Sequence, residues 1–274
     1  MRGSRNRDDF CYRHSKAESF VLCQRCGNTI CPDCQIQAPV GFQCPDCAGV
    51  KKSSGLGKIF SRGASRSVTL ETRPTATFVL LGIIIAIYAG QFLSGGLLTQ
   101  WFLYWPPLTA LEPWRMITTI FVHSSSSVFH ILFNGYSLFI LGTLVERLIG
   151  PGRFVTLFMF SGFGGSVLVL LLSPTSAVVG ASGAIFGLFG ALFVIQRSFG
   201  GANMQLLIVL ALNLVMGFIV PGISWQAHIG GLITGAIVAN IMVKTRGEEP
   251  KRQRQGLALV GLGLGALTVL GVVL

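Results

Sequence analysis

The chain has 274 residues, of which 51% are hydrophobic and only 11% are charged. Soluble globular domains carry about 25% charged residues, so this composition excludes a wholly soluble protein. The formal net charge of +11 does not indicate a nucleic-acid partner. The basic residues cluster beside apolar segments, where they mark membrane topology and contact anionic lipid.

The N-terminal region is polar, and residues 1–10 are expected to be disordered. Residues 11–47 hold all seven cysteines, and one histidine completes four pairs, each separated by two residues. The eight expected ligands are Cys11, His14, Cys23, Cys26, Cys31, Cys34, Cys44 and Cys47. Four such pairs are typical of two tetrahedral zinc sites, and the odd cysteine count argues against disulfides alone. Because so short a module cannot build an adequate apolar core, we expect two structural Zn²⁺ ions to hold it together.

The order of these pairs resembles a B-box-type zinc finger. The resemblance implies a cross-brace, with one ion on Cys11, His14, Cys31 and Cys34 and the other on Cys23, Cys26, Cys44 and Cys47. Sequential pairing is the alternative. Closed sites of this kind suit structure and binding rather than catalysis. We therefore expect the module to dock a protein or lipid in the cytoplasm, and a ubiquitin-ligase role by analogy to RING domains is less well supported.

Residues 48–73 are basic and rich in Gly and Ser, which predicts a flexible linker near a membrane surface. The remainder predicts an all-α polytopic membrane protein, because it contains seven apolar segments close to the length of a membrane span. The expected spans are 75–94, 127–146, 154–172, 181–198, 204–220, 226–243 and 256–274. Residues 246–255 are predicted to form a charged loop before the last span.

The segment 95–126 is too polar and too broken by proline to span a bilayer. It is rich in Trp and Tyr, which favour the membrane interface, and this predicts a structured loop in the outer leaflet. Basic residues precede the first span and recur in every second connection, so the positive-inside rule places the N-terminus in the cytoplasm and the C-terminus outside. The absence of a visible secretory or organelle-targeting segment favours a bacterial inner membrane.

Two polar residues that could take part in a reaction occur in the apolar spans. Ser182 follows Gly180 and opens one span, and His228 lies near the start of another, within Ala227-His228-Ile229-Gly230-Gly231. A serine is a poor nucleophile until a base takes its proton, and a histidine at the same depth can supply that base. Glycines spaced four apart in both spans would let the two helices approach closely enough for this contact.

His130 and Asn134 are four residues apart, so they share one face of a helix. With the backbone N–H of Ser182, these two side chains are candidate donors to an oxyanion. Each of these polar groups alone could simply form a hydrogen bond between helices. Their occurrence together in one chain is what favours catalysis. Glu112, Arg115 and Glu146 are expected to be structural polar anchors, and His123 to support the loop.

These motifs resemble those of the rhomboid family of intramembrane serine proteases. The resemblance is carried by Gly180-Ala181-Ser182-Gly183, Ala227-His228-xx-Gly231-xxx-Gly235, His130-xxx-Asn134, Trp114-Arg115 and Val145-Glu146-Arg147. It implies a six-helix protease domain over residues 74–245, with residues 256–274 as a seventh, additional helix.

The resemblance further implies a catalytic dyad of Ser182 and His228, and an oxyanion hole of His130, Asn134 and the Ser182 amide. The expected substrates are transmembrane proteins cut near the outer leaflet, without a catalytic cofactor. The alternative is a catalytically silent rhomboid-like protein that binds membrane helices. A small transporter is disfavoured, because the inner halves of the spans are apolar.

Overall fold

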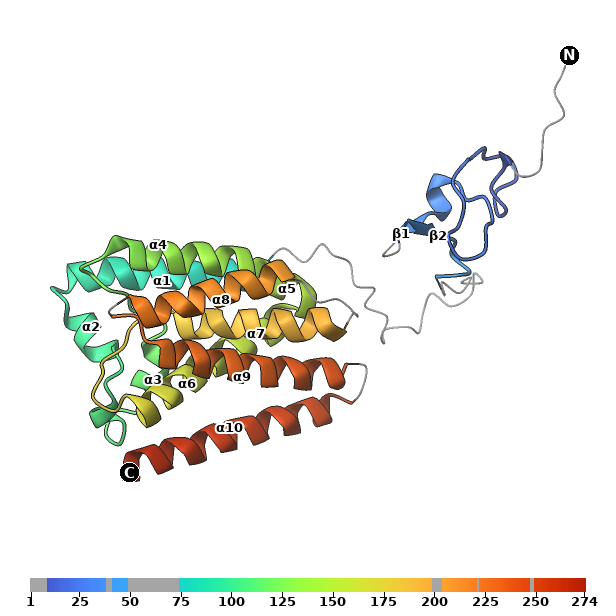
Figure 1. The fold of residues 1–274 in the computed structure, drawn as a ribbon. Coiled ribbons are helices and arrows are strands. Elements are labelled where there is room, and N and C mark those ends of the chain that lie inside the picture. Colours follow the sequence, from blue (N-terminus) through green and yellow to red (C-terminus); the bar gives the residue numbers. More distant parts are fainter. Residues whose placement is uncertain (1–8, 38–40, 49–73, 199–203, 221, 247–248) are drawn as a thin grey trace, which may run out of the picture. The chain divides into compact units, whose positions relative to one another are not determined.

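The computed structural model describes residues 9–37, 41–48, 74–198, 204–220, 222–246 and 249–274 (Figure 1). Most of the N-terminal segment and nearly all of the basic linker lie outside these ranges. The chain divides into two compact units, one up to Ser67 and one from Val68 onward, and each is described by itself.

The N-terminal unit has little regular structure. It contains a 3₁₀ turn, η2 (Pro32–Cys34), and a short hairpin of β1 (Ile36–Gln37) and β2 (Phe42–Gln43), in which Ile36 pairs with Gln43. Its buried apolar cluster consists of five cysteines and Ile30. Order already begins at Asp9 and Phe10, because Phe10 forms an isolated bridge with Glu18. Cysteines therefore make up most of the buried apolar cluster in the described part of this unit.

The second unit is a helical bundle. The long helices are α1 (Thr75–Leu93), α4 (Val128–Ser137) continued by a π-helical turn η4 (Leu138–Gly142) and α5 (Thr143–Ile149), α6 (Pro151–Leu172), α7 (Ser182–Ser198), α8 (Met204–Ile219), α9 (Trp225–Lys244) and α10 (Pro250–Val273). Five of the described helical segments are long and apolar enough to cross a membrane, whereas α7 and α8 are shorter apolar helices. The protein is therefore a multi-pass helical membrane protein.

The predicted loop between the first two spans contains α2 (Leu97–Phe102), the 3₁₀ turn η3 (Pro106–Leu108) and α3 (Arg115–Thr118). Arg115 anchors this loop from a buried position. Its guanidinium donates to the carbonyl oxygens of Gln100 and Leu103 and pairs with Glu112. One buried cation therefore satisfies free carbonyls of α2, which supports the interpretation of Arg115 and Glu112 as structural anchors.

Glu146 fastens the start of α1 to α5. Its carboxylate accepts hydrogen bonds from the backbone N–H groups of Ala76 and Thr77, at 2.9 and 2.7 Å, and from the Thr77 hydroxyl at 2.7 Å. These N–H groups belong to the first turn of α1 and have no partner within that helix. A buried carboxylate at the positive end of a helix dipole is favourable, so Glu146 is a structural anchor.

The last helix starts earlier than expected. Pro250 occupies the first turn of α10, where proline needs no N–H partner, so most of the predicted charged loop 246–255 is helical. The helix packs on α6, where a Cβ at Gly271 would lie 2.8 Å from a side-chain carbon of Leu170. None of its described residues is buried.

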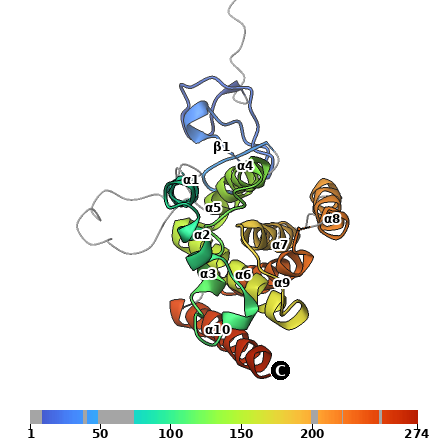
Figure 2. The same ribbon diagram turned by 90° about the vertical axis from the view of Figure 1, so that its left-hand side faces the viewer.

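Helix α7 lies at the centre of the bundle, with α4, α6, α8 and α9 around it (Figure 2). It meets α9 through glycines. A Cβ on Gly231 would lie 1.9 Å from the carbonyl oxygen of Gly183, and a Cβ on Gly235 would lie 2.2 Å from that of Gly187. The two backbones are therefore in direct contact, which only glycine permits.

Substituting alanine for Gly235 is expected to lower the stability of the bundle by about 1–3 kcal/mol, because the new methyl group meets a backbone oxygen that cannot move aside. Gly263 in α10 is the matched control, since a Cβ there meets nothing within 4 Å. Thermal unfolding in detergent, followed by circular dichroism, measures both variants. Equal melting temperatures for Gly235→Ala and Gly263→Ala would contradict the close contact.

Candidate active site and metal centres

Ser182 and His228 meet at one end of the bundle. Ser182 is the first residue of α7, and His228 lies in the first turn of α9. The Oγ of Ser182 is 3.0 Å from the Nε2 of His228, which is hydrogen-bonding distance. His228 is only 6% exposed, whereas Ser182 is partly exposed, so the hydroxyl is the accessible member of the pair.

Local structure at both helix starts sets this distance. Ser224 caps α9, and its Oγ accepts a hydrogen bond from the N–H of Ala227 at 3.3 Å. The carbonyl oxygen of Ala227 lies against Gly183, where a Cβ would be only 3.1 Å away. The glycine that follows the serine therefore lets α9 bring its histidine to the hydroxyl.

The ring of His228 is held by Phe186, a residue that the sequence analysis did not identify. The two rings are stacked, with centroids 4.0 Å apart and planes 10° from parallel. Phe186 is four residues after Ser182, on the same face of α7, and this spacing is the signal that could have found it. The Nδ1 of His228 is buried and has no hydrogen-bond partner among the described residues, so packing rather than a carboxylate orients this imidazole.

His130 and Asn134 lie beside the backbone that leads into Ser182. A Cβ on Gly180 would lie 2.8 Å from the Nε2 of His130 and 3.9 Å from the Nδ2 of Asn134. The Nδ1 of His130 accepts a hydrogen bond from the N–H of Ser124 at 3.2 Å, which leaves the proton of a neutral ring on Nε2. That N–H is then available as a donor close to Gly180.

Asn134 has already committed part of its donor capacity. Its Nδ2 donates to the carbonyl oxygen of His130 at 2.7 Å, so one of its two N–H groups remains for another acceptor. Its Oδ1 is buried without a partner among the described residues. The structure thus brings together all four residues that the sequence analysis assigned to the reaction.

The ring of His123 packs beside the ring of His130, with centroids 5.2 Å apart. Its backbone is held by Gln91 of α1, whose Oε1 accepts from the His123 N–H at 3.0 Å and whose Nε2 donates to the His123 carbonyl at 2.7 Å. This pair of bonds fixes the loop that precedes α4. The sequence shows only that Gln91 is a polar residue within an apolar span, which favours a hydrogen bond to another segment. It does not show that the partner is the backbone of His123.

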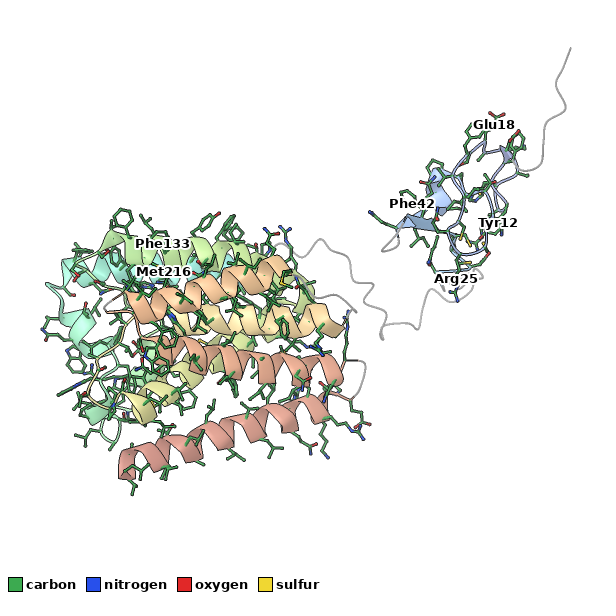
Figure 3. All side chains as sticks on the ribbon, viewed as in Figure 1. Tyr12, Glu18, Arg25, Phe42, Phe133 and Met216 are labelled. Atoms are coloured by element: carbon green, nitrogen blue, oxygen red, sulfur yellow. The ribbon has the colours of Figure 1, made fainter. Side chains whose placement is uncertain are left out.

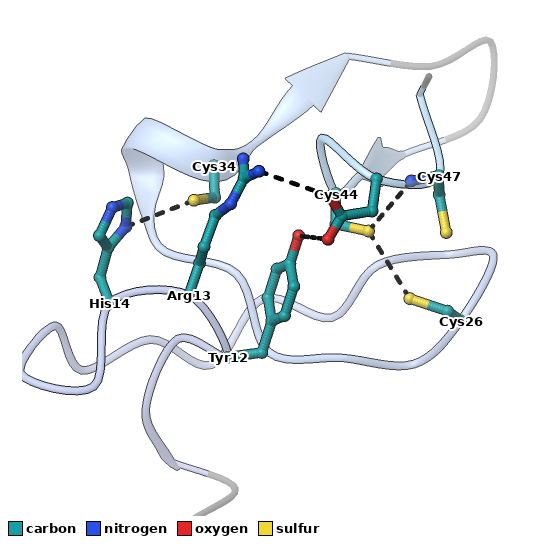
Figure 4. A network of polar contacts seen from close by, with 8 residues as sticks. Tyr12, Arg13, His14, Cys26, Cys34, Cys44 and Cys47 are labelled. Carbon is teal, nitrogen blue, oxygen red and sulfur yellow. Dashed lines mark hydrogen bonds and ion pairs between the residues drawn. The ribbon is translucent and has the colours of Figure 1, made fainter. Parts of the chain in front are cut away.

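The eight predicted metal ligands form two clusters in the N-terminal unit. One contains Cys11, His14, Cys31 and Cys34, the other contains Cys23, Cys26, Cys44 and Cys47, and the ligand atoms of each cluster lie within 4.8 Å of one another. This grouping is the cross-brace and not the sequential arrangement. Figure 4 shows part of both clusters, with His14 beside Cys34 and Cys26 beside Cys44.

The spacing within each cluster fits a tetrahedral ion. Sulfur atoms bound to zinc at about 2.3 Å lie about 3.8 Å apart, and the Sγ atoms of Cys26 and Cys44 are 3.7 Å apart. In the other cluster the Nδ1 of His14 lies 3.2 Å from the Sγ of Cys31 and 3.4 Å from that of Cys34, so Nδ1 is the ligand atom. The two clusters could therefore each hold one metal ion.

The thiols of each cluster shift in opposite directions. Burial and then hydrogen bonds with other cysteines raise the pKa of Cys34 to about 12, and hydrogen bonds with Cys44 and Cys26 raise that of Cys47 to about 12. Burial raises the pKa of the Cys11 and Cys23 thiols, but backbone N–H groups that donate to each sulfur outweigh it, and the pKa of each is about 6. Tyr12 joins the two clusters, since its hydroxyl donates to Asp46 at 2.6 Å between Cys44 and Cys47 (Figure 4). Burial, and then this hydrogen bond, raise the pKa of Tyr12, so the phenol stays protonated as the donor.

The site and the bundle define a class: a helical membrane domain with a serine and a histidine in contact at one end. A model of the Rhomboid domain family matches residues 110–245. The protein YdcA of Bacillus subtilis (strain 168), which is named for the rhomboid proteases, is 36% identical over 141 residues, covering 49% of this chain and 70% of YdcA. The chain belongs to the rhomboid family, a family of intramembrane proteases.

Longer relatives match the same region. Rhomboid protease GluP of Bacillus subtilis (strain 168) is 35% identical over 162 residues, which are 57% of this chain and 31% of GluP. RHOMBOID-like protein 1 of Arabidopsis thaliana is 37% identical over 139 residues, which are 48% of this chain and 35% of that protein. The chain thus spans about a third of the length of these two relatives.

Gly180 generates a prediction for the site. Its φ of +116° is unfavourable for any residue with a Cβ, and a Cβ there would meet the His130 ring. Gly180→Ala is therefore expected to destabilise the protein by about 1–3 kcal/mol. Chemical denaturation in detergent measures this, with Gly152→Ala as a control at an open helical position. A Gly180→Ala protein as stable as the control would mean that this turn tolerates a side chain.

Proposed function

We propose that the protein is an intramembrane serine endopeptidase that cuts transmembrane substrates near the outer leaflet with a Ser–His dyad. The observation that carries the proposal is the 3.0 Å contact between the Ser182 Oγ and the His228 Nε2 at the starts of two helices in contact. Membership of a family whose proteases act on transmembrane substrates in the bilayer supports it.

The reaction is acyl transfer. The Nε2 of His228 takes the proton of Ser182 while Oγ attacks the carbonyl carbon of the scissile peptide bond, giving a tetrahedral oxyanion. His228 then gives the proton to the leaving amine, and the C–N bond breaks to leave an acyl-enzyme. Water, deprotonated by His228, attacks the ester carbonyl, and collapse of the second tetrahedral intermediate returns the proton to Ser182 Oγ.

The oxyanion requires donors that are in place before the reaction. We assign this role to the Nε2–H of His130, the remaining N–H of Asn134 and the backbone N–H of Ser182. The hydrogen bond from Ser124 to the Nδ1 of His130 supports the assignment, since it fixes the tautomer that donates. Gly180 lies against both side chains. The two proposed donors are therefore next to the turn that leads into Ser182.

The imidazole works without a carboxylate partner in this proposal. Stacking on Phe186 keeps its plane fixed, and its burial lets the ring be neutral and ready to accept a proton. The imidazolium that forms transiently is stabilised by the oxyanion opposite it. Because His228 is buried, solvent screens these opposite charges weakly and they attract strongly.

We propose that the N-terminus lies in the cytoplasm and the C-terminus outside, in a bacterial inner membrane. Basic residues support this orientation, because they lie at the ends of α5, α6, α9 and α10 that are opposite the dyad (Figure 1). We retain residues 74–245 as the protease domain and 256–274 as the core of an additional span. The lipid bilayer and a cytoplasmic protein that docks on the zinc module are the other expected partners, with no nucleic acid.

We further propose that each cysteine cluster holds one structural Zn²⁺. Three thiolates with an imidazole, and four thiolates, are both common zinc ligand sets, and neither leaves an open position for catalysis. The metal would supply the folding energy that a single buried Ile30 does not. Zinc has no part in the peptidase reaction.

Ser182→Ala is expected to abolish cleavage of a single-pass reporter, by about 10⁴-fold or more, because no other hydroxyl of the described residues bonds to His228. Cleavage is measured after reconstitution, and a serine-directed phosphonate should label the unaltered protein and not the variant. Ser176→Ala, an exposed position before α7, is the control. Failure of the folded unaltered protein to cleave or react would instead indicate a silent, helix-binding protein.

The purified protein is expected to contain two zinc ions per chain, measured by plasma mass spectrometry. Cys26→Ser should reduce this to one or fewer, and Ser15→Ala should leave it at two. A chelator should make the thiols reactive to maleimide while phosphonate labelling of Ser182 persists. Two retained ions in Cys26→Ser would contradict the assignment of that cluster.

A further inference from the structure

The first turns of α6 and α10 lie side by side at the end of the bundle opposite the dyad. The Nε of Arg153, in the first turn of α6, donates to the Oε1 of Gln253, in the first turn of α10, at 3.1 Å. The Nε2 of Gln253 donates in turn to the Oγ1 of Thr245, where α9 ends, at 3.0 Å. One amide therefore joins three helices and holds the Arg153 guanidinium against α10.

The periodicity of the two helices places a second arginine beside the first. Phe160 follows Arg153 by seven residues, and Gly261 follows Arg254 by seven, so each pair shares one helix face. These two faces meet, because a Cβ on Gly261 would lie 3.7 Å from a ring carbon of Phe160. Both helices start at the same end of the bundle. Arg153 and Arg254 therefore lie two turns before that contact, on the facing sides of α6 and α10.

This arrangement is electrostatically unfavourable unless an anion is bound. The start of a helix carries a partial positive charge, so cations there are repelled. Lys251 is exposed in the same turn of α10 as Arg254. Among the described residues neither arginine nor Lys251 forms an ion pair, and neither does Glu249, the one described carboxylate at the start of α10. The positive-inside rule accounts for basic residues at this end, but not for two arginines on facing helices.

The two guanidinium groups keep most of their donors. The bond to Gln253 uses one of the five N–H groups of Arg153, and Arg254 forms no side-chain hydrogen bond in the described part of the chain. Neither helix start has a side-chain cap. A Cβ on Gly152 would meet nothing within 4 Å, so the start of α6 is open to a ligand. Guanidinium groups and free N–H groups at helix starts are the donors that phosphate oxygens prefer.

The position in the membrane indicates where the phosphate comes from. These first turns begin two candidate membrane spans, Pro151–Leu172 and Pro250–Val273, and the ends of spans lie at the level of lipid headgroups. Leu259 and Leu262 are exposed further along α10 and offer an apolar surface to an acyl chain. Figure 3 shows nitrogen-bearing side chains at the start of α10 and mainly hydrocarbon side chains along the rest of it. This surface fits an amphipathic anion better than free phosphate.

We propose that Arg153 and Arg254 bind the headgroup phosphate of an anionic phospholipid, and that this lipid holds α10 against α6. None of the described residues of α10 is buried, and lipid gives apolar helices little reason to associate, so a bound anion between the two helix starts supplies the attraction that packing lacks. The site is at the other end of the bundle from Ser182, and its existence does not depend on peptidase activity.

The first test measures thermal unfolding of the whole protein in phosphatidylcholine nanodiscs, with and without phosphatidylglycerol. The anionic lipid is expected to raise the melting temperature of the unaltered protein by about 3–6 °C. Arg153→Gln and Arg254→Gln should each lose most of this rise. The matched control is Arg197→Gln in the last turn of α7, which removes the same charge from the same end of the bundle and should keep the full rise. An equal rise in all four proteins, or none in the unaltered protein, would overturn the site.

Arg254→Glu separates a lipid site from a purely structural role of this arginine. The new carboxylate can pair with Arg153 and is favourable at a helix start, so it takes the place of the lipid phosphate. The variant should melt no earlier than the unaltered protein in phosphatidylcholine alone, and phosphatidylglycerol should add nothing. A variant that still gains the full rise, or that melts earlier in both membranes, would contradict the proposal.

Native mass spectrometry in detergent identifies the ligand. The unaltered protein is expected to retain one phosphatidylglycerol in preference to phosphatidylcholine, and Arg254→Gln should bind it about fivefold more weakly. Inorganic phosphate at millimolar concentration should not displace the lipid. Displacement by phosphate would assign the site to a free anion, and equal retention of phosphatidylcholine would show that the negative charge is not recognised. Either result would overturn the proposal.

Discussion

The contact between α7 and α9 is the constraint on which the site depends. A serine and a histidine can share a proton only if their helices nearly touch, and Gly183, Gly187, Gly231 and Gly235 remove the side chains that would separate them. In a bilayer no hydrophobic effect drives helices together, so close backbone packing has to supply the attraction. The same glycines thus hold the two helices together and set the distance between Ser182 and His228.

The remaining polar groups keep the bundle in register around that contact. Glu146 binds the start of α1 to α5, Arg115 binds carbonyl oxygens at the end of α2, and Gln91 binds the His123 backbone in the loop before α4. Each satisfies backbone groups that hydrocarbon would leave unpaired. A rigid frame of this kind fixes His130 and Asn134 near Gly180, and fixed donors are what the proposed oxyanion hole requires.

The sequence was sufficient for features that follow from spacing. Apolar length predicted the helices, the paired ligands predicted two clusters, and the offset of four between His130 and Asn134 predicted one shared face. It did not predict Phe186 stacked on His228 or Gln91 bonded to His123, because each partner comes from a distant segment. The early start of α10 was missed because hydropathy gave more weight to its charged first turn than to the proline that begins it.

The π-helical turn η4 constrains the number of residues in the membrane span Val128–Ile149. Such a turn holds about one residue more than an α-helical turn, so it shifts everything after it by about 100° around the axis. His130 and Asn134 lie before it and Glu146 lies after it. Deleting one residue from Leu138–Gly142 would restore a regular α-helix. The same rotation about the helix axis would then move the Glu146 carboxylate away from α1. The number of residues in this span is therefore as constrained as their identity.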